Sequence, residues 1–93
     1  MKIIIVGAGE VGFHLAKILS QERHDIIVID KSEERLVRVS DALDVMTLEG
    51  SGSRVGTLQK AGAPGADMLI AVTSIDEVNL TSCLLAHKLG TRK

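Results

Sequence analysis

Apolar residues along the chain fall into four short runs, which alternate with segments of helical periodicity. Lys2–Val6 and Asp25–Asp30 are almost continuous stretches of aliphatic, mostly β-branched residues. Runs of this kind are typical of strands that are buried on both faces of a sheet. A weaker run, Asp44–Leu48, predicts a third strand, and Asp67–Val72 predicts a fourth.

Each predicted strand is followed by a segment with a helical pattern. After the first strand, apolar residues recur at helical spacing to about residue 21, at Val11, Leu15, Ile18 and Leu19. Ser32 is an N-cap residue type and predicts the start of a second helix. The apolar stripe of that helix is expected at Leu36, Val39 and Leu43.

Two further helices are predicted in the second half of the chain. Glu49–Ser53 has the composition of a flexible loop, and Ser53 is expected to cap a short helix that ends near Gly62. Ser74 and Glu77 have the spacing of a capping box, which predicts a helix over residues 76–89. Strands that alternate with helices require crossover connections, so we predict an α/β fold with helices on both faces of a mostly parallel sheet. The expected arrangement is one Rossmann-type domain over residues 1–93, with strand order 3-2-1-4.

Composition and charge exclude several classes of partner. The 93 residues carry a net charge of −1, with 11 basic and 12 acidic residues and no block of either sign. Phe13 is the single aromatic residue. These features predict no nucleic-acid partner, because a basic surface and stacking platforms are both missing. No apolar run is long enough to span a bilayer, and Cys83 as the one cysteine fits a reducing, cytosolic setting.

The glycines at Gly7, Gly9 and Gly12 lie between the first strand and the first helix. In this context a GxGxxG spacing predicts a tight turn, a close approach of the backbone to a pyrophosphate, and close packing of helix on strand. Asp30 ends the second strand, 23 positions after Gly7. Its carboxylate is expected to accept hydrogen bonds from ribose hydroxyls and to repel a 2′-phosphate, which predicts NAD(H) rather than NADP(H). The alternative is a structural turn followed by an exposed acid.

Two more loops are expected to line the same crevice. Gly50 and Ser51 follow the third strand, where they would flank adenosine; the alternative is a plain connector. Thr73 and Ser74 follow the fourth strand at the point where the strand order reverses, which is the usual ligand crevice of such sheets. Their hydroxyls are candidates for contact with phosphate or with the second nucleoside, and capping of the last helix by Ser74 is compatible with this role.

The sequence predicts no catalytic or metal-binding residues. His14, His24 and His87 are scattered without an acid or a nucleophile at triad spacing, and Cys83 is expected to be a helix-packing thiol. Histidine and cysteine are too few and too dispersed for a zinc site. We therefore expect no enzyme activity and no redox turnover by this chain alone.

The last predicted helix carries two apolar faces. Val78, Leu85 and Leu89 share one face, which is expected to pack on the sheet, whereas Leu80 and Leu84 lie almost opposite. A second apolar stripe predicts a partner surface, and dimerisation through it or through the edge of the fourth strand is expected. The alternative is two incidentally exposed leucines.

Several stretches together resemble a known family. These are MKIIIVGAGEVG, IVID ending in Asp30, and EGSGS followed by LQKAGAPGADMLIAVTSIDEVN. They resemble the RCK/KTN domain class, and in particular the amino-terminal nucleotide-binding domain of Trk potassium-uptake regulators (TrkA), over essentially the whole chain. The later block, with Asp76, Glu77 and Asn79, is its most specific part.

The resemblance implies a regulator on the cytoplasmic face of a potassium transporter or channel. Such domains bind NAD(H) or adenine nucleotides (ATP/ADP), assemble as dimers and larger rings, and change conformation as ligands exchange. By motif, the resemblance assigns ligand contacts to Gly7, Ala8, Gly9, Glu10, Val11, Asp30, Gly50, Ser51, Thr73 and Ser74. Family members continue into a fifth strand, which would begin near Gly90–Lys93, so a carboxy-terminally truncated domain is expected. The alternatives are the cofactor half of an NAD-dependent dehydrogenase and an ATP/ADP sensor of the same fold.

Overall fold

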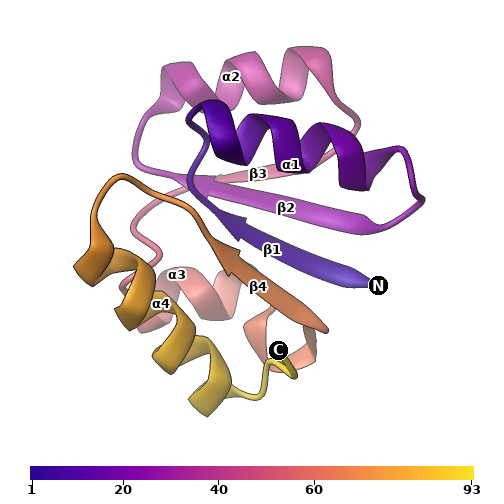
Figure 1. Ribbon diagram of the computed structural model, residues 1–93. Helices are drawn as coiled ribbons and strands as arrows, with labels where there is room; N and C mark the ends of the chain where they lie inside the picture. The colour runs from indigo at the N-terminus through magenta and orange to yellow at the C-terminus, as the bar shows by residue number, and fades with distance from the viewer.

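Four parallel strands form the central sheet of the computed structural model, which describes residues 1–93 (Figure 1). The strands are β1 (Lys2–Val6), β2 (Asp25–Asp30), β3 (Met46–Glu49) and β4 (Met68–Ala71). Their order in the sheet is β3-β2-β1-β4, and all neighbours run parallel. The predicted α/β class, Rossmann-type arrangement and strand order are confirmed.

Four α-helices cover the two faces of the sheet. They are α1 (Glu10–Ser20), α2 (Glu33–Ala42), α3 (Val55–Lys60) and α4 (Asp76–Leu89), with a short 3₁₀ helix η1 (Ala63–Gly65) before β4. Helices α1 and α2 lie on one face, and α3 and α4 lie on the other (Figure 1). None of these helices is long and apolar enough to cross a membrane.

Strand β1 supplies the centre of the core on both faces. Ile3 and Ile5 belong to the apolar cluster under α1 and α2, whereas Ile4 and Val6 belong to the cluster under α3 and α4. All four side chains are buried. Successive side chains of a strand point to opposite faces, so an uninterrupted aliphatic run is what a doubly covered strand requires.

Two strand boundaries differ from the prediction. The third strand pairs with β2 only from Met46, opposite Ile27, so the expected start at Asp44 was wrong. The fourth strand is shorter than predicted at both ends. At its start, the Asp67 N–H still donates to the Lys2 carbonyl (2.8 Å), and the Asp67 carboxylate accepts a hydrogen bond from the Lys2 N–H (2.8 Å).

Helix capping was predicted correctly once in three cases. The Ser32 hydroxyl accepts a hydrogen bond from the Arg35 N–H (3.3 Å) and caps α2, as expected. Helix α3 instead has Arg54 at the N-cap, and α4 has Ile75, and neither position makes a side-chain cap. The predicted caps at Ser53 and Ser74 were therefore wrong, because hydrogen bonds within the preceding loops take the place of capping.

The apolar pattern of helix α1 predicts its buried face only in part, since Leu15 and Leu19 pack on the core but Val11 and Ile18 do not. Gly12 and Ala16 are its buried residues, whereas Val11 and Ile18 are more than half exposed. A Cβ on Gly12 would overlap the carbonyl oxygen of Gly7. The small residues face the sheet because the helix lies too close to the β1–α1 turn for larger ones.

Smaller corrections concern α2 and α4. Helix α2 ends at Ala42, so Leu43 packs on the core as the C-cap residue and not within the helix. In α4 the expected packing of Leu85 and Leu89 on the core is confirmed. Cys83 is exposed, so its predicted packing role was wrong: its position in α4 faces away from the sheet, and Ser82 is buried instead.

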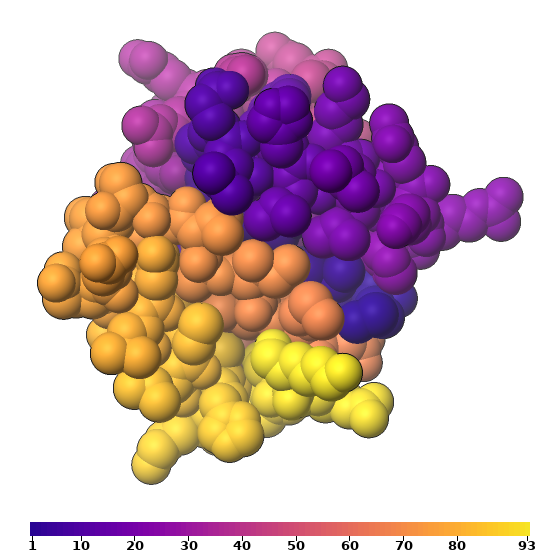
Figure 2. Space-filling view, viewed as in Figure 1, coloured from indigo at the N-terminus to yellow at the C-terminus, as the bar shows by residue number.

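The last residues run beside the outer edge of β4. The Leu69 N–H donates to the Lys93 carbonyl (2.8 Å), and the Arg92 N–H donates to the Ala66 carbonyl (3.2 Å). In Figure 2 these residues, in yellow, lie against the orange surface of β4 and its surroundings. Part of the strand edge is therefore already paired within the chain.

Candidate functional site

A cleft of about 620 Å³ opens at the carboxyl ends of the strands. It lies between the neighbouring strands β1 and β4, whose following helices lie on opposite faces of the sheet. This is the topological switch point at which doubly wound sheets bind ligands. Of the predicted site residues, the lining includes Gly7, Gly9, Glu10, Val11, Asp30, Gly50, Ser51, Thr73 and Ser74. The structure thus brings together four loops that are far apart in the sequence. Ala8 and Gly12 are buried beneath the cleft and do not line it.

The turn after β1 directs the chain into the cleft. Gly7 has φ +117°, a conformation that L side chains rarely adopt, and a Cβ there would lie 3.0 Å from the Val72 backbone. The Gly7 N–H donates to the Ile29 carbonyl (2.8 Å), which ties the turn to β2. This turn places the amino-terminal end of α1 at the cleft.

Gly9 is open to the cleft, in contrast to Gly7 and Gly12. The nearest atom to a Cβ built on Gly9 is Arg35 Nη1, at 3.9 Å. Gly9 is also the N-cap residue of α1 and provides no side-chain cap. The first N–H groups of a helix have no partner within the helix, so this end attracts anions and leaves room for a phosphate close to the backbone.

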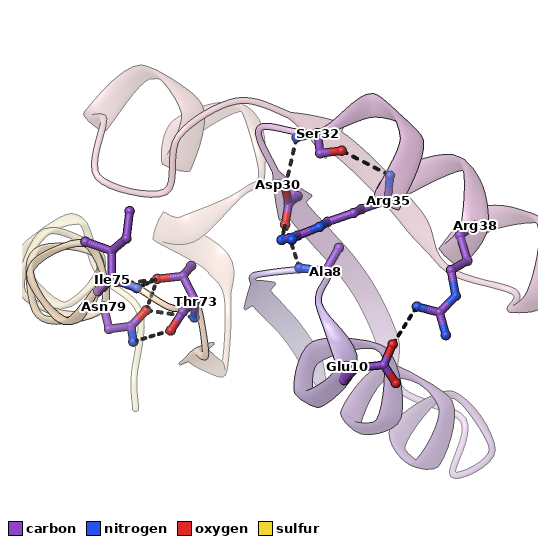
Figure 3. A network of polar contacts seen from close by, with 9 residues as sticks. All are labelled: Ala8, Glu10, Asp30, Ser32, Arg35, Arg38, Thr73, Ile75 and Asn79. Carbon is purple, nitrogen blue, oxygen red and sulfur yellow. Dashed lines mark hydrogen bonds and ion pairs between the residues drawn. The ribbon is translucent and has the colours of Figure 1, made fainter.

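Asp30 fastens the glycine loop to the end of β2. Its Oδ2 accepts a hydrogen bond from the Ala8 N–H (2.7 Å), and its Oδ1 accepts one from the Ser32 N–H (2.8 Å) (Figure 3). Each carboxylate oxygen can accept a second hydrogen bond, so the group can still receive ribose hydroxyls. The sequence predicted a role for Asp30 in ligand binding, but it did not predict that Asp30 also holds the glycine loop in place.

The loop after β3 is packed and has hydrogen bonds within it. The hydroxyls of Ser51 and Ser53 are 2.7 Å apart and share a hydrogen bond, and the Ser53 N–H donates to Ser51 Oγ (3.2 Å). Gly52 is buried, and a Cβ there would lie 3.0 Å from Ser82 Oγ. The loop therefore presents Gly50 and Ser51 to the cleft in a defined conformation.

The loop after β4 is held by Asn79 of α4. Asn79 Oδ1 accepts hydrogen bonds from the Thr73 hydroxyl (2.6 Å) and the Thr73 N–H (2.9 Å), and its amide donates to the Thr73 carbonyl (3.0 Å) (Figure 3). The Thr73 hydroxyl also accepts from the Ile75 N–H (3.2 Å). The Thr73 side chain is thus engaged within the loop, whereas Ser74 is exposed at the mouth of the cleft.

Sequence reasoning missed several residues of the cleft. They include Ser32, Arg35, Ile75 and Val78, of which Arg35 is cationic; Lys31, which directly follows Asp30, also lines the cleft. Arg35 Nη1 lies 3.9 Å from Asp30 Oδ2. The position of Arg35 in the first turn of α2 could have predicted its place in the cleft, because helices that follow a strand of such a sheet begin at the edge where ligands bind.

The cleft has the chemistry of a binding site. It offers a helix amino terminus and cations for phosphate, a fixed carboxylate for hydroxyl groups, and apolar side chains such as Val78. No group of three or more metal-ligating side chains occurs in the structure. Together with the strand order, these features define a Rossmann-type domain of the nucleotide-binding class.

The chain belongs to the TrkA-N domain family, whose model matches residues 3–93. The Trk system potassium uptake protein TrkA of Halomonas elongata is 51% identical over 89 residues, which cover 96% of this chain and 20% of that protein. A TrkA homolog 1 of Methanosarcina mazei is 48% identical over 93 residues, which cover 100% of this chain and 22% of that protein. The family resemblance is confirmed, and the chain spans about a fifth of the length of these relatives.

Solved structures share the fold. The Shewanella denitrificans Kef CTD in AMP-bound form superposes with a TM-score of 0.79 at 26% identity, over 95% of this chain and 52% of that one. The NAD(P)-binding domain of an exopolyphosphatase-related protein from Archaeoglobus fulgidus gives a TM-score of 0.81 at 18% identity, over 95% of this chain and 65% of that one. The second likeness supports the fold alone.

Proposed function

We propose that the chain is a regulatory domain that binds NAD(H) and controls potassium uptake through a ligand-dependent change of conformation. The observation that carries this proposal is the Asp30 carboxylate, which holds the glycine loop and lines the switch-point cleft, where it would accept hydrogen bonds from ribose hydroxyls. The relatives that match the whole chain are named as Trk system potassium uptake proteins, which supports the link to transport. Glu10 and Val11 at the α1 amino terminus and Gly50 and Ser51 beyond β3 would complete the contacts.

The proposed partner is a membrane subunit of the transporter, which the domain would meet on the cytoplasmic face. The proposal includes peripheral attachment through that subunit, without nucleic-acid binding or insertion into the bilayer. Residues 91–93 already run beside β4, and we propose that a fifth strand continues there in the whole protein. No residue of the cleft is assigned a catalytic role, so the proposed domain is not an enzyme.

An ATP/ADP sensor is the second candidate function. The observation that favours it is the likeness to a protein whose structure holds AMP, because AMP is an adenine nucleotide without a nicotinamide nucleoside. A cofactor half of a dehydrogenase is less well supported, since the matched relatives are potassium uptake proteins.

Calorimetric titration with NADH, NAD, NADPH, ATP and ADP side by side tests the proposal. We expect NADH to bind more tightly than NADPH, because the fixed carboxylate of Asp30 lies where a 2′-phosphate would sit. Equal affinities for NADH and NADPH would contradict the assignment of Asp30, and tighter ATP binding would favour the sensor. Steady oxidation of NADH with a panel of alcohols, aldehydes and oxo acids would show an enzyme.

The exposed leucines of α4 are expected to support a homodimer. Leu80 is 64% exposed and Leu84 is 59% exposed, one turn apart on the face away from the sheet. The other expected route, the β4 edge, is weakened because the tail already pairs with Leu69. Leu80→Glu plus Leu84→Glu should convert a dimer to a monomer in sedimentation at micromolar concentration, since burying either charge would be costly.

Val37→Glu is the matched control for this pair. Val37 is an exposed aliphatic residue of α2, on the opposite face of the sheet. Its replacement should leave the sedimentation coefficient unchanged. A wild-type chain that sediments only as a monomer would refute the proposed dimer, and a dimer that survives both leucine changes would point to the strand edge.

A further inference from the structure

Two arginines project from α2 one turn apart, and only one of them is fully engaged with the protein. Arg38 donates to Glu10 Oε1 (3.0 Å), and its guanidinium lies 4.4 Å from the centre of the Phe13 ring. The Arg35 side chain makes no hydrogen bond, and its nearest carboxylate oxygen is Asp30 Oδ2 at 3.9 Å. An arginine has five N–H donors, so the guanidinium of Arg35 keeps its full capacity for a ligand.

The free guanidinium lies over the glycine loop. Its Nη1 is the closest atom to the place where a Cβ of Gly9 would stand, and both residues line the cleft. Figure 3 shows the Arg35 side chain running from α2 past Asp30 towards Ala8. The amino terminus of α1 lies on the other side of the same space. An anion beside Gly9 would therefore meet a helix terminus and a guanidinium together.

Pairing with Asp30 does not account for the position of Arg35. Both oxygens of Asp30 already accept backbone hydrogen bonds at 2.7 and 2.8 Å, from Ala8 and Ser32. The distance of 3.9 Å is too long for a hydrogen bond, and the Arg35 side chain is 61% exposed. Ion pairs this exposed contribute little to stability. The hydrogen bonds from Ala8 and Ser32 therefore hold the Asp30 carboxylate in place without Arg35.

We propose that Arg35 binds the 5′-phosphate of the adenosine moiety, beside Gly9, when a nucleotide occupies the cleft. This inference rests on the proposed nucleotide-binding function and adds the residue that reads the phosphate. The site then divides its recognition between two neighbouring side chains. Asp30 contacts ribose hydroxyls, and Arg35 contacts the phosphate that NADH, ATP, ADP and AMP have in common. The planar fork of an arginine fits two phosphate oxygens at once, which a lysine does not reproduce.

The test compares Arg35→Gln with Arg38→Gln, using NADH, AMP and adenosine as ligands in calorimetric titrations of the whole chain. Arg38 is the matched control because it lies on the same helix, carries the same charge and does not line the cleft itself. We expect Arg35→Gln to weaken NADH and AMP by about 10- to 100-fold, as for a lost hydrogen bond between two charged groups. Adenosine should change by less than about threefold. Arg38→Gln should change all three affinities by less than about threefold, because Arg38 does not line the cleft and only its longer-range charge acts there. Thermal unfolding of both variants checks that the fold is intact.

Each other outcome would overturn the inference in a distinguishable way. An equal loss for adenosine and AMP would show that Arg35 acts through Asp30 and the ribose. A parallel titration with NADPH in which only the NADPH affinity falls would assign Arg35 to a 2′-phosphate. Unchanged AMP affinity in Arg35→Gln, with a wild-type chain that binds AMP, would refute the phosphate contact while leaving the proposed function standing. A wild-type chain that binds none of the nucleotides would refute the proposed function and this inference together.

Discussion

Gly12→Ala is expected to destabilise the domain by about 3 kcal/mol or more, at the upper end of what overpacking costs. The added methyl group would overlap the Gly7 carbonyl oxygen and lie 2.8 Å from the Gly7 carbonyl carbon. Both are backbone atoms of the β1–α1 turn, so no side chain can rotate to make room. Alanine favours a helix over glycine by only about 0.5–1 kcal/mol, which is too little to compensate.

A loss of this size is a large part of the total stability. Domains of this length have free energies of unfolding of about 5–14 kcal/mol. Chemical denaturation should show the lower midpoint directly, and the melting temperature should fall by roughly 12–24 °C. Because the turn must move, we also expect NADH binding to weaken in whatever fraction remains folded.

Gly56→Ala is the matched control. Gly56 lies within α3, and a Cβ built there meets nothing within 4 Å. The same change should therefore leave stability unchanged or raise it by about 0.5–1 kcal/mol. If Gly12→Ala and Gly56→Ala unfold at the same denaturant concentration, the close packing of α1 on the turn is not a constraint on this fold.

Asp30→Asn is expected to weaken NADH binding by about 10- to 150-fold and to destabilise the free domain by about 1.5–3 kcal/mol. The first figure corresponds to about 1.5–3 kcal/mol, the range for hydrogen bonds to a charged group. The second follows because Asp30 accepts from both Ala8 and Ser32. An asparagine has one acceptor oxygen, so one of these two N–H groups would face an N–H donor.

The discrimination between NADH and NADPH should also shrink in Asp30→Asn, because the negative charge beside the 2′ position is removed. Asp25→Asn is the control, since Asp25 begins the same strand at the end far from the cleft and is exposed. It should leave nucleotide affinities within about twofold of the wild type. Calorimetry with both cofactors measures the affinities, and denaturation without ligand measures the stability. Unchanged NADH affinity in Asp30→Asn would remove Asp30 from the ligand site.

The strand order and the location of the cleft could be predicted from the sequence because both depend on local patterns. Continuous aliphatic runs such as Ile3–Val6 indicate strands that are covered on both faces, and their alternation with helices leaves few possible topologies. The glycine spacing and the acid at the end of β2 mark the crevice for the same reason. Boundaries were less accurate where the pattern is weak, as at β3, which pairs only from Met46.

The predicted caps of α3 and α4 failed, and part of the apolar stripe of α1 is exposed, because both features depend on contacts between distant residues. Ser74 has a capping-box spacing, yet the loop before α4 is organised by Asn79 and Thr73. Leu15 and Leu19 of α1 pack on the core as their spacing suggests, but Val11 and Ile18 are exposed because the nearness of the Gly7 carbonyl puts Gly12 and Ala16 against the sheet. Differences in helix propensity of a few tenths of a kcal/mol are too small to outweigh such steric constraints.

The sequence by itself determined the class of fold, the cleft and the acid beside it, since each follows from periodicity and motif spacing within a short stretch. Only the tertiary structure decided what those residues do to one another. It showed that Asp30 braces Ala8, that Thr73 is engaged with Asn79, and that the guanidinium of Arg35 stands free over Gly9. Hydrogen bonds and close approaches between strand ends depend on distances set by the packing of the whole sheet, and no local stretch of sequence specifies those distances.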